Sequence, residues 1–394
     1  MAEQKTPFKL LKTFSGLIHR QPQFMTDKLD VKSYHLKFLN KQGQPLDDDS
    51  PVPDFLEKLP EILPKISDRQ QALLSMPESW REALYESHET RFSLILDVSG
   101  GRYPSTDKKG FSFAKNAENI QDNEKTNTLL IDIQKQSAQL LTKHLPSWRK
   151  HHKILCATNV DDHEQYEFCK MHDLDLLQGQ FYTVPFAKGN QKVPLSAQTL
   201  MTLLVNLQDP NIKPEDLAMT INQDLSLSYK LLRLINSAFF GLPRKVNSIQ
   251  QAVVMLGHKK IKIWASLLSL AAVDNKPNEL RVVAMTRARM CELLSKYYKG
   301  SAETCFAAGL FSALDALLDK PLDAVLSQLP LSPEFNEALL NQSGPIGKAL
   351  RDVLNYEKGD WLALGASPLP IELIALSYLD AIHWAKELNT QLVN

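Results

Sequence analysis

Three aspartates in the first half of the chain stand at the ends of strand-like apolar runs. Asp97 lies in FSLILDV, Asp132 ends LLID, and Asp161 follows ILCATNV. Carboxylates at the carboxyl ends of parallel strands can hold a divalent cation that activates water. Isolated aspartates bring little charge to such an ion, so we predict no catalytic residues, no metal site and no cofactor.

The histidines and cysteines give no stronger indication of a catalytic or metal site than the aspartates do. The chain has one His-Asp dipeptide, His172–Asp173, which follows a helical stretch and is interpreted as an exposed loop pair. The four cysteines lack CxxC spacing, so reduced and mostly buried thiols are expected. They are Cys156, Cys169, Cys291 and Cys305.

The composition is that of a globular protein of two or three domains. The chain has 394 residues, 43% hydrophobic, with 45 basic residues balancing 45 acidic ones. Nucleic acid is therefore not an expected partner, although a salt-sensitive nucleic-acid surface beside Trp264 is kept as a rival hypothesis. No apolar run reaches the ~18 residues of a membrane span, so a cytoplasmic protein with no membrane partner is expected. The basic cluster behind the rival hypothesis comprises Arg244, Lys245, His258, Lys259, Lys260 and Lys262.

The first half alternates strand-like and helical segments, which predicts an α/β sheet or barrel. Two of the strand candidates are almost continuously apolar, as is typical of strands buried on both faces of a parallel sheet. A helix is expected over Asp161–Met171, and Gly43–Pro53 and Gly100–Asn123 are expected to be long loops. The strand candidates are Val31–Leu39, Phe92–Val98, Thr128–Ile133, Lys153–Val160 and Leu174–Val184.

The second half is predicted to be all-α. Leu227, Leu231, Leu234 and Ala238 form one apolar helical stripe. The turn-rich stretch Phe186–Pro194 separates the halves, giving predicted domains at 1–187 and 188–394. Further helices are expected over Lys259–Val273, Leu280–Tyr298, Ala302–Leu318 and Pro370–Leu392.

The run KLLRLINSAFFGLPRKVNSIQQAVVMLGHKKIK, from Lys230, resembles the signature of HDOD domains. The resemblance extends over about 195–365 and implies a helical bundle related to metal-dependent HD phosphohydrolases. Where those relatives carry His-Asp, this chain has Ser312 and Ala313, which cannot replace metal ligands. The matching signature positions are Asn236, Ser237, Phe240, Gly241, Pro243, Ser248, Ala252, Leu256 and Gly257.

The first half resembles an EAL domain, the barrel that hydrolyses cyclic di-GMP in its active members. HRQPQFMTDKLDVKSYHLKF and LQGQFYTVP carry the resemblance, which implies a short, degenerate TIM-barrel-like fold. About 187 residues fall below the ~200–250 typical of such barrels, so an incomplete barrel is left open. Residual motif positions are Asp97, Asp132, Asp161 and Gln178, and lost ligand positions are His35, Val98, Leu130 and Thr158.

Together the two resemblances predict a non-catalytic regulator or scaffold in bacterial signal transduction. It would act through protein–protein contacts with an unidentified signalling partner, and homodimerisation is left open. One alternative is a cyclic di-GMP receptor without hydrolysis, for which Arg102, Lys108 and Lys109 form the basic loop available to an anion. A second alternative is a residual metal-dependent phosphodiesterase or phosphohydrolase.

Overall fold

The structure, a computed structural model, describes residues 14–67, 70–87, 93–101, 109–121, 124–186, 195–209, 211–271, 273 and 276–393. The chain divides into two compact units. The first contains Met1–Tyr182 and Asn355–Leu379, and the second contains Thr183–Leu354 and Asp380–Asn394. The domain boundaries expected from the sequence, 1–187 and 188–394, stay a prediction.

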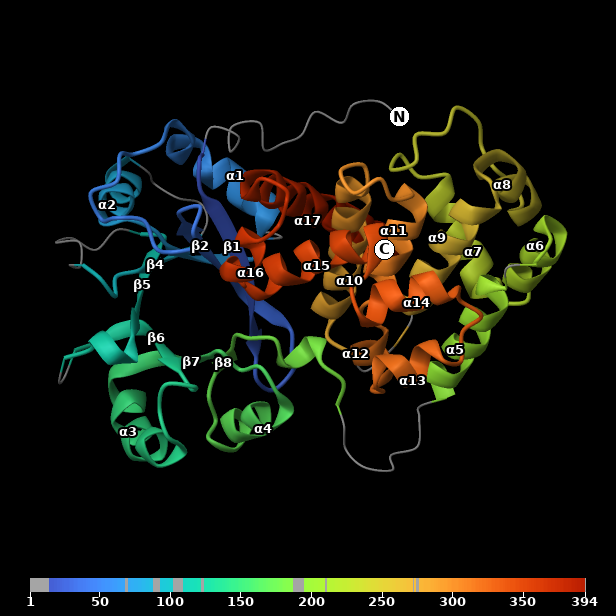
Figure 1. Cartoon of the computed structure of the whole chain (residues 1–394). Coiled ribbons are helices and arrows are strands. Elements are labelled where there is room, and N and C mark those ends of the chain that lie inside the picture. The colour runs from blue at the N-terminus through green and yellow to red at the C-terminus, as the bar shows by residue number, and fades with distance from the viewer. Residues whose placement is uncertain are drawn as a thin grey trace. The chain divides into compact units, whose positions relative to one another are not determined.

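The first unit is built on a closed barrel of eight strands (Figure 1). The strands from β2 to β8 pair in parallel, whereas β1 is antiparallel to both of its neighbours, β2 and β8. The α/β first half is thus confirmed, and the barrel closes despite its short sequence. The strands are β1 Leu17–Met25, β2 Val31–Leu39, β3 Gln71–Ser75, β4 Leu94–Asp97, β5 Phe111–Asn116, β6 Thr126–Asp132, β7 His152–Thr158 and β8 Leu176–Leu177.

Two expectations about this barrel are wrong. The stretch Gly100–Asn123, expected to be a loop, contains β5, whose side chains are mostly only half-buried and so lack a strong apolar pattern. The stretch Leu174–Val184, expected to be a strand, forms only the two-residue β8 and then a 3-10 helix over Phe181–Thr183. Two residues suffice because β8 pairs with β1 on one side and β7 on the other.

One residue from each of six successive strands forms an apolar layer inside the barrel. Alternate residues of a strand point to the same side, so each strand sends one of these side chains inward. The layer supports the polar residues that follow it at the carboxyl ends of the strands. It comprises Leu73, Ile95, Ala114, Leu130, Cys156 and Leu176.

Helices of the first unit follow the strands and begin with side-chain caps where the sequence provides them. Ser137 accepts a hydrogen bond from the backbone N–H of Leu140, and Asp162 accepts one from that of Gln165. Such caps satisfy N–H groups that have no partner within the helix. The helices are α1 Leu59–Ile66, α2 Glu78–Ser87, α3 Ala138–His151 and α4 His163–Met171.

The segment Asn355–Leu379 returns to the barrel and contacts β1. The Tyr356 hydroxyl donates to the carbonyl of Ile18 at 2.9 Å, and the Tyr378 hydroxyl donates to that of Arg20 at 3.3 Å. This segment includes the end of α15 (Gly344–Lys358), α16 (Trp361–Gly365) and the start of α17 (Ile371–Val393). The first unit is therefore assembled from both ends of the sequence.

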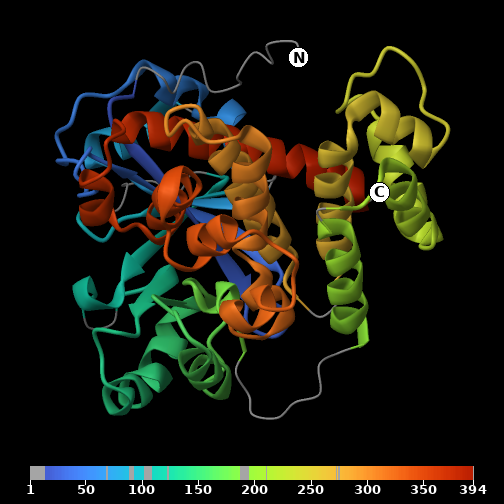
Figure 2. The same ribbon diagram turned by 45° about the vertical axis from the view of Figure 1, so that its right-hand side comes forward.

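Within the described residues of the second unit, helices are the regular secondary structure (Figure 2). Asn236 stabilises the turn after α7, because its amide both donates to the carbonyl and accepts from the N–H of Val246 at 2.7 Å. Ser248 caps α8, and Gly241 and Gly257 take positive φ angles of 58° and 86°. The helices are α5 Leu195–Gln208, α6 Pro214–Asn222, α7 Leu225–Ile235, α8 Ile249–Leu256, α9 His258–Ala271, α10 Asn278–Ser295, α11 Ala302–Phe311, α12 Leu314–Leu318, α13 Leu322–Leu326 and α14 Pro333–Leu340.

One predicted helix, Ala302–Leu318, is broken at Ser312 and Ala313 into α11 and α12. The carbonyl of Ser312 accepts a hydrogen bond from Arg287 at 3.0 Å instead of continuing the helix. All four cysteines are free and buried, as expected. Within the described ranges, no helix combines the length and apolarity needed to cross a membrane.

Candidate functional site at the barrel mouth

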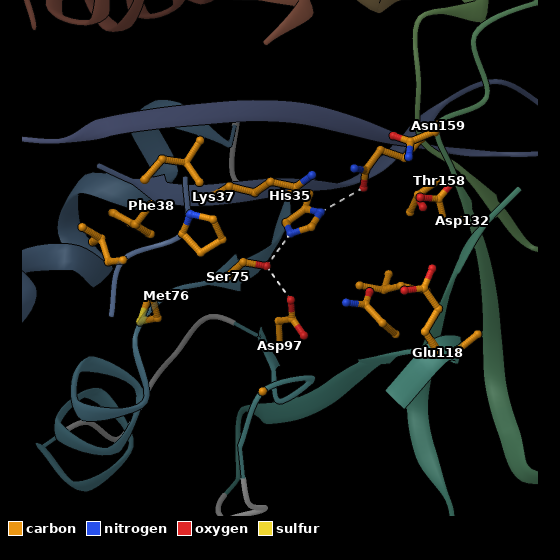
Figure 3. Close-up of a pocket in the computed structure, with 18 of the residues that line it drawn as sticks. His35, Lys37, Phe38, Ser75, Met76, Asp97, Glu118, Asp132, Thr158 and Asn159 are labelled. Carbon is orange, nitrogen blue, oxygen red and sulfur yellow. Dashed lines mark hydrogen bonds between the residues drawn. The ribbon is translucent and has the colours of Figure 1, made fainter. Parts of the chain in front are cut away.

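A cavity of about 610 Å³ opens at the carboxyl ends of the barrel strands. The register of the sheet explains how its polar lining is gathered: Lys37 pairs with Ser75, and Leu74, the neighbour of Ser75, pairs with Leu96. Lys37, Ser75 and Asp97 thus lie at one level on three adjacent strands. Figure 3 shows these side chains around the cavity, with Asp132 and Thr158 on another part of its wall.

A chain of hydrogen bonds crosses the mouth. His35 Nδ1 lies 3.1 Å from Gln178 Oε1, His35 Nε2 lies 2.7 Å from Ser75 Oγ, and Ser75 Oγ donates to Asp97 Oδ2 at 2.6 Å. Ser75 has a single hydroxyl proton and gives it to Asp97, and a neutral imidazole has a single N–H, so the tautomer of His35 decides whether it donates to Gln178 or to Ser75. The pKa of His35 is held well below its usual value, first by burial and then by the charge of Lys37.

Gln178 is held in place by glutamines of β1. Gln23 Nε2 donates to Gln178 Oε1 at 3.0 Å, and Gln178 Nε2 donates to Gln21 Oε1 at 2.8 Å. Ser33 Oγ in turn donates to Gln23 at 2.7 Å. Buried polar groups need such partners, since an unpaired one costs about 1–3 kcal/mol. The mouth is therefore a preorganised polar surface.

Lys37 brings a positive charge into the cavity. It follows His35 by two residues on β2, so both side chains lie on the same face of the strand. Burial lowers the pKa of Lys37, and the charges of Asp97 and Asp132 partly offset this effect. Lys37 is not among the residues predicted from the sequence, although its two-residue spacing from His35 is a signal for a shared strand face.

The structure brings most of the sequence-predicted barrel positions together. Asp97, Asp132 and Gln178 line the cavity, and so do His35, Leu130 and Thr158. Asp161 is absent from the cavity lining: it accepts hydrogen bonds from the N–H of Gln180 at 3.0 Å and from the amide of Gln134 at 2.8 Å. Val98 is a fully buried core residue. Arg102 and Lys108 lie outside the described residues.

The mouth does not fit the pair of divalent cations that the EAL resemblance implies. Asp97 already accepts from Ser75 at 2.6 Å with one oxygen and from the N–H of Ser99 at 3.0 Å with the other. Asp132 accepts from the N–H of Gln134 at 3.1 Å. In the part of the chain that the structure describes, no group of three or more His, Cys, Asp or Glu side chains could hold a metal ion. Divalent ions prefer several free oxygen ligands.

In the helical unit, the position where the HD relatives carry His-Asp is closed. Ser312 and Ala313 are buried, and Arg287 donates to the carbonyl of Ser312.

The His-Asp dipeptide of the first unit, His172 and Asp173, follows α4, where His172 is the C-cap and Asp173 takes a positive φ of 52°. These residues form a helix end, as interpreted from the sequence.

Comparisons with known proteins place part of the chain in a family. Residues 193–318 match the sequence model of the HDOD domain, which confirms the predicted HDOD domain. A cyclic di-GMP phosphodiesterase, CdgJ of Vibrio cholerae, is 29% identical over 240 residues, which are 59% of this chain and 56% of that protein. Uncharacterized protein YuxH of Bacillus subtilis is 30% identical over 244 residues, 60% of this chain and 59% of that one.

The chain thus matches less than two thirds of the length of each of these relatives. Among solved structures, an EAL domain protein from Listeria monocytogenes is 10% identical, with 43% of this chain and 87% of that chain covered at a TM-score of 0.31. The expectation of a non-catalytic scaffold is wrong, because a similar protein bears the name of an enzyme. The missing ligands were given too much weight in that expectation.

Proposed function

We propose that this chain is a cyclic di-GMP phosphodiesterase whose site is the barrel mouth. The observation that carries the proposal is the cavity of about 610 Å³ with Lys37, Asp97 and Asp132 in its wall, in a chain similar to a protein named cyclic di-GMP phosphodiesterase. A cavity of this size is within the range that small-molecule ligands occupy. The barrel would then be a degenerate EAL domain joined to the HDOD domain in bacterial signalling.

The residues of the mouth suggest a division of roles. Lys37 faces the phosphodiester and stabilises negative charge that develops on its oxygens. Asp132 takes a proton from the attacking water, whose oxygen bonds to phosphorus while the bond from phosphorus to the leaving ribose oxygen breaks. The leaving oxygen then takes a proton from solvent. His35 and Gln178 act as the rigid polar wall against which the dinucleotide rests.

The proposal is tested by incubating the purified full chain with cyclic di-GMP and separating the nucleotides by chromatography. We expect the linear dinucleotide from the wild type and a loss of at least ~100-fold in rate for Asp132→Asn, the size of a lost general base. Asp161→Asn is the matched control and should change the rate less than ~2-fold, because Asp161 is absent from the cavity lining.

The outcomes separate the hypotheses. Binding of intact nucleotide without any product would overturn hydrolysis and leave the receptor alternative. No binding and no product would overturn the proposal entirely. Equal losses in Asp132→Asn and Asp161→Asn would remove Asp132 from the role of base.

A further inference from the structure

A second cavity, of about 640 Å³, lies in the helical unit. Its wall comes from α7, from the residues before α8 and from the end of α17, which all belong to this unit. Leu232, Leu234 and Val246 supply its apolar lining, and none of its described lining residues is an aspartate or a glutamate. No carboxylate of this wall would therefore repel an anion.

Asn236 fixes how two sides of this cavity meet. Its amide donates to the carbonyl and accepts from the N–H of Val246, both at 2.7 Å, and it also donates to the carbonyl of Leu232 at 2.9 Å. Lys245 and Asn247 flank Val246, so these hydrogen bonds place both residues beside the end of α7. The asparagine of the HDOD signature thus builds part of the cavity wall.

Two cations line the cavity from different segments. Arg233 lies on α7, and Lys245 lies before α8. Arg233 Nη2 donates to the carbonyl of Gln391 at 2.8 Å, its one hydrogen bond within the described residues. A guanidinium has five N–H donors, so several remain for a ligand. The carboxylate of Glu387, four residues before Gln391 on α17, lies 3.3 Å from His383 and is absent from the lining.

Tyr229 gives the cavity an exposed aromatic face. It lies one turn before Arg233 on α7, the residue is 65% exposed, and Arg233 Cζ lies 6.0 Å from its ring centroid. A nucleobase is flat and stacks on such a ring, whereas phosphate oxygens take charge-assisted hydrogen bonds from arginine and lysine. An aromatic ring beside a guanidinium therefore offers both interactions to one nucleotide.

We propose that this cavity of the helical unit binds a nucleoside phosphate, with the base against Tyr229 and the phosphate on Arg233 and Lys245. The cavity belongs to the other unit than the barrel mouth, so this site does not rest on the proposed function. Within the basic cluster beside the HDOD signature, Lys245 lines the cavity and its neighbour Arg244 does not. A general basic surface for nucleic acid would use both residues, so variants of the two distinguish these kinds of site.

The phosphate contact is tested by calorimetric titration of the full chain with guanosine 5′-monophosphate. The wild type should show saturable binding, and Lys245→Gln should weaken the affinity about 10-fold, as for one lost hydrogen bond between charged groups. Arg244→Gln is the matched control: it removes the same charge one residue away, outside the lining, and should change the affinity less than ~2-fold.

Lys245 and Arg244 are both exposed, so neither variant should unfold the chain. Equal losses of affinity in Lys245→Gln and Arg244→Gln would overturn the site, because they would show a diffuse effect of charge. Absence of saturable binding by the wild type would overturn it as well.

The base contact is tested at Tyr229. Tyr229→Leu should weaken binding of guanosine 5′-monophosphate about 5–100-fold, whereas Tyr229→Phe, which keeps the flat ring, should bind like the wild type. Inorganic phosphate should bind more weakly than the nucleotide, and Tyr229→Leu should not change its affinity. Equal affinities of the wild type for the two compounds would overturn a nucleotide as the ligand.

The barrel mouth is distinguished from this cavity by Lys37→Met, which removes a cation of the mouth. Binding of guanosine 5′-monophosphate should not change in this variant. A loss of binding in Lys37→Met without a loss in Lys245→Gln would place the nucleotide at the mouth and overturn the inference. Failure to hydrolyse cyclic di-GMP would instead count against the proposed function alone, because that reaction is assigned to the mouth.

Discussion

The barrel mouth and the break between α11 and α12 are two places where a resemblance predicts that metal ligands have been lost. At the mouth, polar side chains still surround a cavity of about 610 Å³. At the helical break, Ala313 is completely buried and Ser312 nearly so. The first position is therefore an open polar site, whereas the second is a packed interior.

The backbone explains this difference. Strand ends in a closed barrel are held apart by the pairing of neighbouring strands, so smaller side chains leave space between them. Helices carry their hydrogen bonds internally and can pack more closely when side chains shrink. At the break, the Arg287 guanidinium fills the interior and binds the carbonyl of Ser312 at 3.0 Å. Of these two positions, the barrel mouth is therefore the one with space for a ligand.

The largest loss of stability should come from a polar substitution at the packed break between α11 and α12. Ala313→Asp places a carboxylate at a fully buried position and should lower the free energy of unfolding by at least ~3 kcal/mol. Denaturant unfolding of the full chain measures this. Val254→Asp on α8, where the side chain is 84% exposed, is the control and should cost less than ~1 kcal/mol. Similar losses in the two variants would mean that the break is not a packed interior.

A smaller change in the free energy of unfolding should come from His19, a buried histidine of the barrel. Burial lowers the pKa of His19 from 6.5 to about 4, so the unfolded chain binds more protons than the folded one between these pH values. The free energy of unfolding therefore falls as pH drops from 6.5 toward 4, by up to ~3 kcal/mol for this residue. His19→Gln should remove that contribution.

The pH experiment compares wild type and His19→Gln by urea unfolding at pH 7 and pH 4.5. The wild type should lose about 2–3 kcal/mol more than the variant on acidification. Parallel losses in both proteins would show that His19 is accessible to protons in the folded barrel, and would weaken the distinction between the two units.

The smallest effect should come from adding a carboxylate at the open mouth. Thr158→Glu projects into the cavity and should change the free energy of unfolding by less than ~1 kcal/mol. Its neighbour on β7, Ala157, is fully buried, so Ala157→Glu should cost several times as much. If both variants lose the same stability, the mouth is not the open site described above.

Parts of this fold follow directly from the sequence, and other parts depend on tertiary context. The apolar runs around Leu94–Asp97 and Thr126–Asp132 predicted strands because burial on both faces requires such residues. The first strand, LIHRQPQFM, has no such pattern, because its polar side chains are satisfied by partners far away in sequence. Gln23 and Gln178, for example, are separated by 155 positions.

In the candidate site too, the sequence located some residues, whereas the contacts between others depend on tertiary structure. Family motifs located Asp97, Asp132 and Gln178, but no local pattern could reveal that Ser75 joins His35 to Asp97. That arrangement depends on the register between β2, β3 and β4. Asp161 matched a motif equally well and is instead used to hold the loop at Gln180. The motifs therefore located the region of the candidate site, and the register of the strands determined which side chains meet there.

The return of Asn355–Leu379 to β1 has a consequence for how the chain is made. During synthesis β1 leaves the ribosome early, whereas Tyr356 and Tyr378, whose hydroxyls bind the carbonyls of Ile18 and Arg20, emerge more than 300 residues later. All eight strands lie between Leu17 and Leu177, so they can pair long before this segment is made. The first unit is nevertheless complete only with Asn355–Leu379, and the second only with Asp380–Asn394, so both units gain their last packing contacts late in synthesis.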